Sequence, residues 1–284
     1  MNVLRVVLRL VLTLVVLVLA ILCILYVRGV TLANGKVQRR VPAFTAAGDS
    51  ASLARGAHIA DIACAACHAP SLAGPDSAMI DAPMFAVVHP PNLTPGGPLH
   101  GASDGQMARA IREGVSLDDR RLFIMPSGAF HRMSDADLAA VIGYLKSLPP
   151  ITHETRPRKI GPVAALLMAA GQIPSRLPDP IDQPVVAPPR GATVEYGAYL
   201  SSIYGCKECH AADLHGVKAS GGPPPGPDVV RVAHAVPYET FDNAVRHGVG
   251  SNGRQLSIEM PWSFFAGMDD DEVQALYAYI KSLP

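Results

Sequence analysis

The chain has 284 residues, and its 24 Lys and Arg are balanced by 24 Asp and Glu, so the formal net charge is zero. Nucleic-acid binding normally needs a basic excess, so this composition argues against that class of function. The length suits about two domains of ordinary size. The 25 Gly and 26 Pro predict loop-rich domains with a few helices.

The N-terminal stretch predicts a transmembrane anchor over residues 1–30. Leu10 to Val27 form an 18-residue run without a charge. As a helix this run would extend about 27 Å, close to the hydrocarbon thickness of a bilayer. Arg5 and Arg9 precede it, and the positive-inside rule keeps that end in the cytoplasm. We expect an uncleaved single-pass anchor with the rest of the chain exported; a secretory signal cleaved near Ala33 is the alternative.

Two short motifs share the pattern Cys-x-x-Cys-His, which is typical of the attachment of haem c. Their thiols must reach two vinyl groups on one porphyrin edge and form thioethers, and the histidine is then held under the ring, where it can ligate iron. We therefore expect two covalently bound haem c groups. The motifs are Cys64-Ala65-Ala66-Cys67-His68 and Cys206-Lys207-Glu208-Cys209-His210.

A zinc site or a redox dithiol is the alternative for each cysteine pair. Zinc would need four ligands from motifs that lie 142 residues apart, and both histidines would remain unexplained. The fifth cysteine, Cys23, lies inside the N-terminal apolar run, so no pair remains for a structural disulfide.

The sequence around the two motifs repeats, which predicts two similar domains. Each domain should contain a helix that carries the motif, a loop-rich middle, one middle helix and a closing helix. The predicted order is a spacer at 31–50, a first domain at 51–149, a proline-rich connector at 150–190 and a second domain at 191–284. The best-matched segments are Gly56–Ile59 with Gly197–Leu200, and Leu145–Pro149 with Ile280–Pro284.

The closing helices are predicted by an apolar face at helical spacing, which runs from Leu138 to Leu148 and again from Val273 to Leu283. Each follows an acidic cap region, and Asp269 to Glu272 has the form of a capping box. In the connector, Val163 to Ala170 predicts a helix too short to span a bilayer. We expect it to pack against one or both haem domains; contact with a membrane surface is the alternative.

The second axial ligand of each iron decides between electron transfer and catalysis. Met125 and Met260 are each followed by proline at equivalent places in the repeat, and we expect them to be these ligands. Met133 and Met268 recur eight residues later, but each immediately precedes a helix cap and fits a hydrophobic staple better. Several histidines lack a counterpart in the other half, which disfavours a shared bis-histidine scheme.

The chain resembles class I cytochrome c domains, and more narrowly the membrane-attached cytochrome subunits of bacterial quinone-linked dehydrogenases. The resemblance implies an all-α fold with two tandem class I cytochrome c domains after the N-terminal transmembrane helix. Such subunits often carry three haems and a C-terminal anchor, whereas this chain has two motifs and an N-terminal apolar run. The narrower resemblance is carried by Pro91-Asn92-Leu93-Thr94, by Arg121-Leu122 before Met125-Pro126, and by Ser134 to Leu138.

We therefore expect an electron carrier, not an enzyme, anchored in a bacterial inner membrane with both haem domains in the periplasm. It would carry electrons between a dehydrogenase or quinone system and a terminal acceptor, with dehydrogenase or oxidase subunits as partners. Methionine ligation raises the reduction potential relative to a bis-histidine site. The alternative is a di-haem peroxidase or other haem oxidoreductase with one open iron. The N-terminal side has about nine residues, too few for a signalling role as a haem-based sensor.

Overall fold

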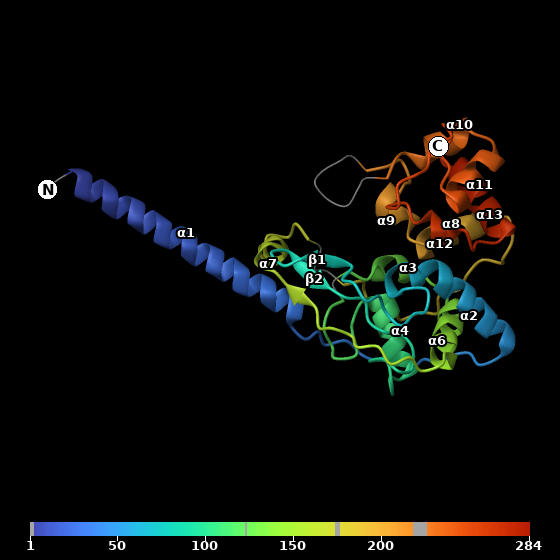
Figure 1. Cartoon of the computed structure of the whole chain (residues 1–284), viewed down its shortest axis with the longest axis horizontal. Helices are drawn as coiled ribbons and strands as arrows, with labels where there is room; N and C mark the ends of the chain where they lie inside the picture. The colour runs from blue at the N-terminus through green and yellow to red at the C-terminus, as the bar shows by residue number, and fades with distance from the viewer. Residues whose placement is uncertain (1–2, 123, 174–176, 218–225) are drawn as a thin grey trace.

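The computed structural model describes residues 3–122, 124–173, 177–217 and 226–284. A long N-terminal helix leads into two small helical domains that lie against each other (Figure 1). The mainly helical fold predicted from the sequence is confirmed. The helices are α1 Val3–Asn34, α2 Ser50–Ala63, α3 Ala65–His68, α4 Asp104–Glu113, α5 Ser127–Phe130, α6 Asp135–Ser147, α7 Pro162–Ala169, α8 Val194–Ile203, α9 Cys206–His210, α10 Val229–Ala235, α11 Tyr238–His247, α12 Trp262–Phe265 and α13 Asp270–Ser282.

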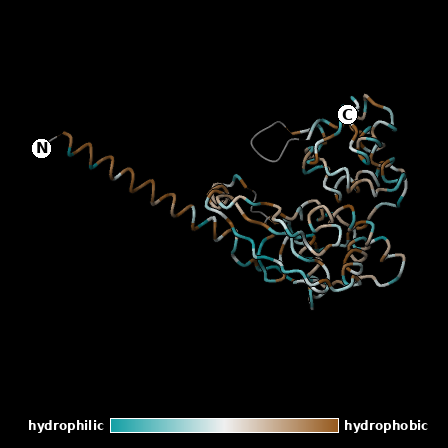
Figure 2. The backbone as a smooth tube through the Cα atoms, in the orientation of Figure 1, coloured by the Kyte–Doolittle hydropathy of each residue, from teal (hydrophilic) through white to brown (hydrophobic). Residues whose placement is uncertain are grey.

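Helix α1 projects from the rest of the chain and is hydrophobic along most of its length (Figure 2). It is long and apolar enough to cross a membrane, and none of its most apolar window is buried within the chain. The helix continues past residue 30 to Asn34. Its last carbonyls lack intrahelical partners, and arginine side chains supply the missing donors. Arg121 donates to the Leu32 carbonyl at 3.0 Å, and Arg158 to the Ala33 carbonyl at 2.5 Å.

A small antiparallel sheet, which the sequence patterns do not predict, joins the connector to the first domain. Its strands are β1 Ile80–Ala82, β2 Ala86–Val88 and β3 Lys159–Ile160, in the order β1-β2-β3. Strands of two or three residues are too short to leave a readable alternation of polar and apolar residues. The sheet leads directly into α7, which packs against the end of α1. Helix α7 also touches the first domain, because the Val163 amide donates to the Met84 carbonyl at 2.9 Å, so α7 has the end of α1 as a partner that the sequence did not predict.

Each domain is built on a pair of crossed helices, α2 with α6 and α8 with α13. A glycine lets each pair approach closely at equivalent positions. A Cβ added to Gly56 would lie 2.0 Å from the Ala140 carbonyl oxygen, and one added to Gly197 would lie 2.0 Å from that of Ala275. The predicted capping box at the start of α13 is present, with Asp269 as the N-cap.

The two domains meet through equivalent elements. Helix α2 of the first domain contacts α12 of the second, and α8 of the second contacts α5 of the first. Since α2 corresponds to α8 in the sequence repeat, and α5 to α12, the two contacts are related by an approximate two-fold axis. The interface is thus an internal version of the isologous contact seen in symmetric dimers.

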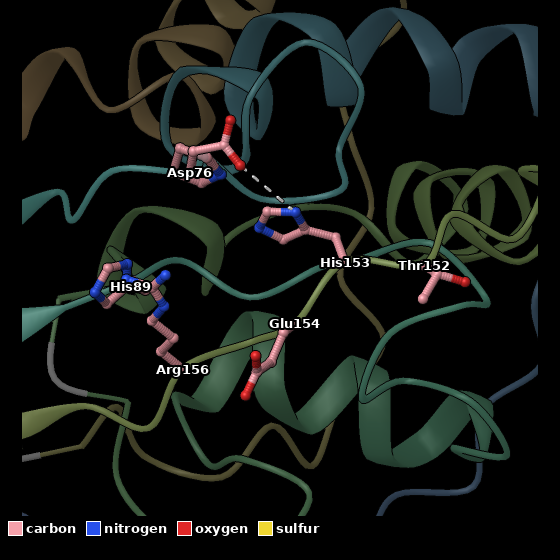
Figure 3. A pocket seen from close by; sticks show the side chains of 7 residues that line it. Asp76, His89, Thr152, His153, Glu154 and Arg156 are labelled. Carbon is pink, nitrogen blue, oxygen red and sulfur yellow. Dashed lines mark ion pairs between the residues drawn. The ribbon is translucent and has the colours of Figure 1, made fainter.

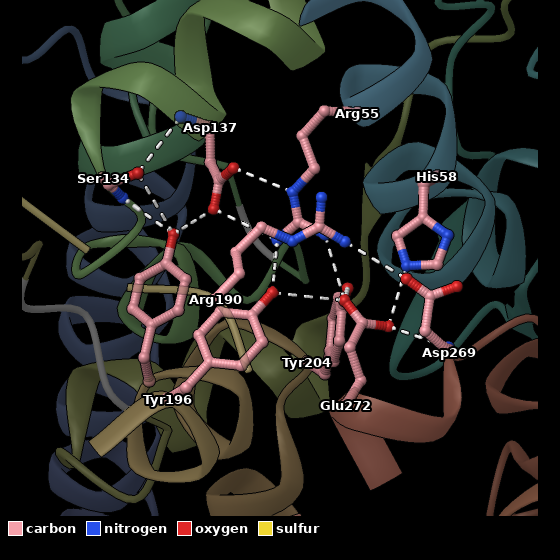
Figure 4. Close-up of polar contacts among 10 residues, drawn as sticks. Arg55, His58, Ser134, Asp137, Arg190, Tyr196, Tyr204, Asp269 and Glu272 are labelled. Atoms are coloured by element: carbon pink, nitrogen blue, oxygen red, sulfur yellow. Dashed lines mark hydrogen bonds and ion pairs between the residues drawn. The ribbon is translucent and has the colours of Figure 1, made fainter. Parts of the chain in front are cut away.

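Polar side chains fill the centre of this interface (Figure 4). Arg55 on α2 donates from Nε to Asp137 Oδ1 at 2.9 Å, from Nη1 to Glu272 Oε1 at 3.0 Å and from Nη2 to Tyr196 Oη at 3.1 Å. Arg55 and Tyr196 occupy equivalent repeat positions, as do Asp137 and Glu272. The arginine therefore lies near the approximate axis and bonds one carboxylate from each domain.

Two further contacts of this interface occupy equivalent positions in the repeat. His58 Nε2 lies 2.8 Å from Glu272 Oε2, and Tyr199 donates to Asp137 Oδ2 at 2.6 Å. The Glu272 side chain is 1% exposed. Burial alone would raise the pKa of Glu272, but hydrogen bonds and charge from His58 and Arg55 outweigh it and lower the pKa to about 2.

Valine at Gly56 or Gly197 is expected to force each helix pair apart. Overpacking of this kind costs about 2 kcal/mol or more, because the obstruction is backbone that cannot rotate away. Denaturant unfolding of the full chain should show a lower midpoint for Gly56→Val and for Gly197→Val. Gly48→Val is the matched control, because nothing lies within 4 Å of a Cβ added at Gly48. Equal midpoints for all three variants would contradict the close crossing.

The lowered pKa of Glu272 predicts a stability that is lost in acid. Its stabilisation is fully present above the ordinary pKa of 4.5 and disappears as the pH falls toward about 2. The shift corresponds to about 3 kcal/mol. The free energy of unfolding is measured from pH 6 to 2. The part of its pH dependence that comes from Glu272 should be absent in Glu272→Gln. It should remain in Glu239→Gln, which changes an exposed residue. An unchanged pH dependence in Glu272→Gln would exclude the ionised buried glutamate.

Candidate haem sites

Both Cys-x-x-Cys-His motifs lie on a single helical turn at the end of a longer helix. In the first domain α2 ends at Ala63, and α3 follows with Cys64 as its N-cap. Amides of Cys67 and His68 both donate to the Cys64 carbonyl, at 3.1 and 3.0 Å. In the second domain α9 begins at Cys206 after Gly205, a left-handed residue with φ of 74°. In each motif, one short helical segment therefore contains both cysteines and the histidine.

The loop after each motif has the same unusual backbone. Ala69 and Leu72 have φ values of 63° and 56°, and Ala211 and Leu214 have 67° and 65°. Residues with a Cβ seldom adopt this left-handed region, and they keep it only where the surroundings enforce it. The amides of Gly74 and Gly216 then donate to the carbonyls of the motif histidines, each at 2.9 Å. The two loops that follow the motifs therefore share the same strained backbone conformation.

His68 and His210 have identical partners. Nδ1 of His68 lies 2.8 Å from the Pro91 carbonyl oxygen, and Nδ1 of His210 lies 2.8 Å from that of Pro227. A carbonyl acceptor holds the imidazole proton at Nδ1 and leaves the Nε2 lone pair for a metal. Burial lowers the pKa of His68, against the opposing effect of the Pro91 hydrogen bond. At His68 the neutral form of the imidazole is therefore favoured.

The four motif cysteines are free thiols in environments that disfavour the thiolate. Burial raises the pKa of Cys64 to about 12, with a smaller contribution from Cys67, and raises that of Cys206 to about 11. Each motif places two cysteines and a histidine on one short helix, with the histidine held by a backbone carbonyl. This is the arrangement that covalent attachment of haem c needs.

The two pairs of candidate methionines have different surroundings. Met125 and Met260 are partly buried and precede α5 and α12, and each begins the same tight turn, with its carbonyl accepting an amide two residues on at 2.8 Å. Met133 and Met268 are 2% and 3% exposed and belong to the hydrophobic core. This burial agrees with a packing role for the second pair.

Arg112 and Arg246, which occupy equivalent repeat positions, brace the start of the closing helices. They donate to the carbonyls of Met133 and Met268, respectively. Each also forms an ion pair, with Asp135 Oδ1 at 2.7 Å and with Asp270 Oδ1 at 2.8 Å. Both arginines thus hold the segment that leads from the methionine loop into α6 or α13.

Sequence reasoning did not find the cluster around Arg55. The available signal was that Arg55 and His58 lie shortly before the first motif and have aromatic counterparts at equivalent repeat positions. No periodicity indicates that a charged side chain on one helix will be buried by a second domain. The residues concerned are Arg55, His58, Asp137, Tyr196, Tyr199, Tyr204 and Glu272.

A polar hollow of about 280 Å³ lies near the loop that follows the first motif (Figure 3). His153 Nδ1 lies 3.8 Å from Asp76 Oδ1 at one side of it. Arg156, His89 and Glu154 complete the charged part of its lining. Acidic and basic groups are mixed here, so the hollow selects neither an anion nor a cation.

Similarities to known proteins match both domains. The sequence model of the cytochrome c family matches residues 53–149 and 194–284. The chain is 37% identical over 100 residues to an alcohol dehydrogenase (quinone) cytochrome c subunit of Gluconacetobacter polyoxogenes, covering 31% of this chain and 21% of that protein.

Two further relatives are cytochrome subunits of other dehydrogenases. A gluconate 2-dehydrogenase cytochrome c subunit of Pantoea cypripedii is 34% identical over 100 residues, covering 31% of this chain and 22% of the relative. A fructose dehydrogenase cytochrome subunit of Gluconobacter japonicus is 28% identical over 139 residues, covering 45% of this chain and 28% of the relative. The matched stretch spans about a fifth of the length of the first two relatives. Because the family model covers most of the chain, once in each repeated domain, the chain belongs to the cytochrome c family.

Proposed function

We propose that the protein is a membrane-anchored di-haem electron carrier with two equivalent sites. Cys64 and Cys67 would hold one haem c, and Cys206 and Cys209 the other. The proposed axial pairs are His68 with Met125 and His210 with Met260. The observation that carries this proposal is the duplicated geometry around His68 and His210, including the same carbonyl partner and the same strained loop.

The iron of haem c can gain or lose one electron while the haem stays covalently attached to the chain. The chain's own residues supply the thiols for attachment and fix each imidazole through a backbone carbonyl. A second strong ligand in each domain would close the iron to substrates. Matching methionines in both domains therefore favour a carrier over a peroxidase, which needs one open site.

The relatives and helix α1 support a proposal for the partner and the location. Cytochrome subunits of alcohol, gluconate and fructose dehydrogenases are among the relatives. We infer that a periplasmic or membrane dehydrogenase, or the quinone system it serves, exchanges electrons with this chain. Helix α1 would anchor it in the bacterial inner membrane with both domains in the periplasm. Zero net charge favours docking through local patches over long-range steering.

Replacement of either proposed distal methionine by alanine should remove the contribution of one haem to the spectrum of methionine-ligated haem. The weak near-red band of ferric methionine-ligated haem is expected to fall by about half in Met125→Ala and in Met260→Ala, and to vanish in the double variant. Met133→Leu and Met268→Leu should retain it, because a volume-conserving change keeps the core packed. Loss of the band in the leucine variants alone would reverse the assignment.

The carrier role is tested by reaction with peroxide and by the partner. The resting protein should show two low-spin haems that react negligibly with peroxide. Mild-detergent solubilisation from the native membrane should co-purify a dehydrogenase, whose substrate then reduces both haems. A high-spin haem that turns over peroxide would replace the carrier with the peroxidase alternative.

A further inference from the structure

The end of α1 marks where the chain would leave the bilayer, if α1 is the anchor proposed above. The uncharged run ends at Val27, and Arg28 is the first charged residue after it. The helix continues to Asn34, which adds about 10 Å beyond the apolar run. Whatever packs against residues 28–34 therefore lies at the level of lipid headgroups.

Helix α7 packs at this level. A Cβ added to Gly29 would lie 1.8 Å from the Ala165 carbonyl oxygen, so the two backbones are in contact. Ala33, Ala164 and Ala165 are all at most 1% exposed. Small residues thus seat α7 firmly against α1 and hold its remaining side chains close to the bilayer surface.

Two large apolar side chains of this assembly are exposed. Val163 on α7 is 40% exposed, and Met84 on the turn between β1 and β2 is 66% exposed. The two are adjacent, because the Val163 amide donates to the Met84 carbonyl at 2.9 Å. No charged residue occurs in the sequence from Ile160 to Ile173. An uncharged, partly exposed helix beside a membrane-spanning helix suits the interfacial region of a bilayer.

Cations surround the same exit. Arg28, Lys36 and Arg40 are exposed, and in the described part of the chain no carboxylate forms an ion pair with any of them. Lys36 and Arg40 line an open hollow of about 520 Å³ with Arg39 and Asp119. Lys36 lies two residues beyond the end of α1, and Arg40 lies six residues beyond it, at most about 20 Å away.

Two carboxylates of the neighbouring loop already have other partners. Asp119 pairs with the buried Arg109 at 2.9 Å, and Asp118 pairs with Arg120 at 3.2 Å. The chain as a whole has no net charge, so an excess of cations at this one place is a local feature. Its complement is a surface of negative charge at headgroup height.

We propose that Arg28, Lys36, Arg40, Met84 and Val163 form an exit platform that binds the surface of an anionic bilayer. The cations pair with lipid phosphates, and the two apolar side chains enter the interface. With α7 fixed on α1, the platform holds the first cytochrome domain in one orientation on the membrane. The inference rests on the proposed anchor and adds the lipid class and a second point of attachment.

The test uses the full haem-loaded chain in nanodiscs. A spin label is placed at Met84→Cys in a Cys23→Ser background, where haem occupies the other four cysteines. Its collision rates with oxygen and with a water-soluble nickel chelate are compared in zwitterionic lipid with and without phosphatidylglycerol. Ile258→Cys, which labels a residue 88% exposed in the second domain, is the control position.

The platform predicts a severalfold higher oxygen-to-nickel ratio at residue 84 when phosphatidylglycerol is present. Lys36→Gln with Arg40→Gln should abolish that rise, whereas Arg231→Gln with Lys281→Gln, exposed cations of the second domain, should not. The label at residue 258 should stay aqueous throughout. An aqueous label at 84 in both lipids would overturn the proposal, as would a label shielded from both probes, which would indicate a protein cover.

A label on the native Cys23 separates failure of the platform from failure of the anchor. If Cys23 is lipid-accessible while residue 84 stays aqueous, the anchor stands and the platform is wrong. If Cys23 is itself aqueous, α1 does not span the bilayer and both inferences fall.

Discussion

The guanidinium of Arg55 is the contact on which the arrangement of the two domains depends. It bonds Asp137 of its own domain and Glu272 of the other, in an interface that also buries Tyr196. Removal of one partner from a buried ionic cluster leaves an uncompensated charge, which typically costs about 3–5 kcal/mol. Because α2 and α8 lead into the two Cys-x-x-Cys-His motifs, this cluster also sets how the two motifs lie relative to each other.

The duplication extends from sequence to backbone geometry. Ala69 and Ala211 share the same positive-φ conformation, and the side chains of His68 and His210 each contact a proline carbonyl. A strained loop that recurs at equivalent positions indicates that its conformation serves the site. Two sites built alike suit an electron carrier, in which neither iron needs an open position. The interface is less symmetric, since His58 on one side corresponds to Tyr199 on the other.

Sequence reasoning succeeded where a local pattern has one physical meaning. The helices α6 and α13 were predicted by apolar spacing, and the cap at Asp269 by its acidic residues. Sequence reasoning failed where contacts between residues far apart in the chain determine the structure. The sheet β1-β2-β3 is too short to show a pattern, and α7 packs on α1 because two backbones approach at Gly29. Burial of Arg55 depends on a second domain that no local pattern reveals.

Two covalent haems in equivalent sites are the central claim, and intact mass spectrometry of the full chain tests it most directly. The wild-type chain should carry the mass of two haems. Replacement of Cys64 and Cys67 by alanine should leave one, and replacement of Cys206 and Cys209 should leave the other, identified by the haem-bearing peptide. A wild-type chain with a single haem, or with zinc bound to its cysteines, would contradict the account.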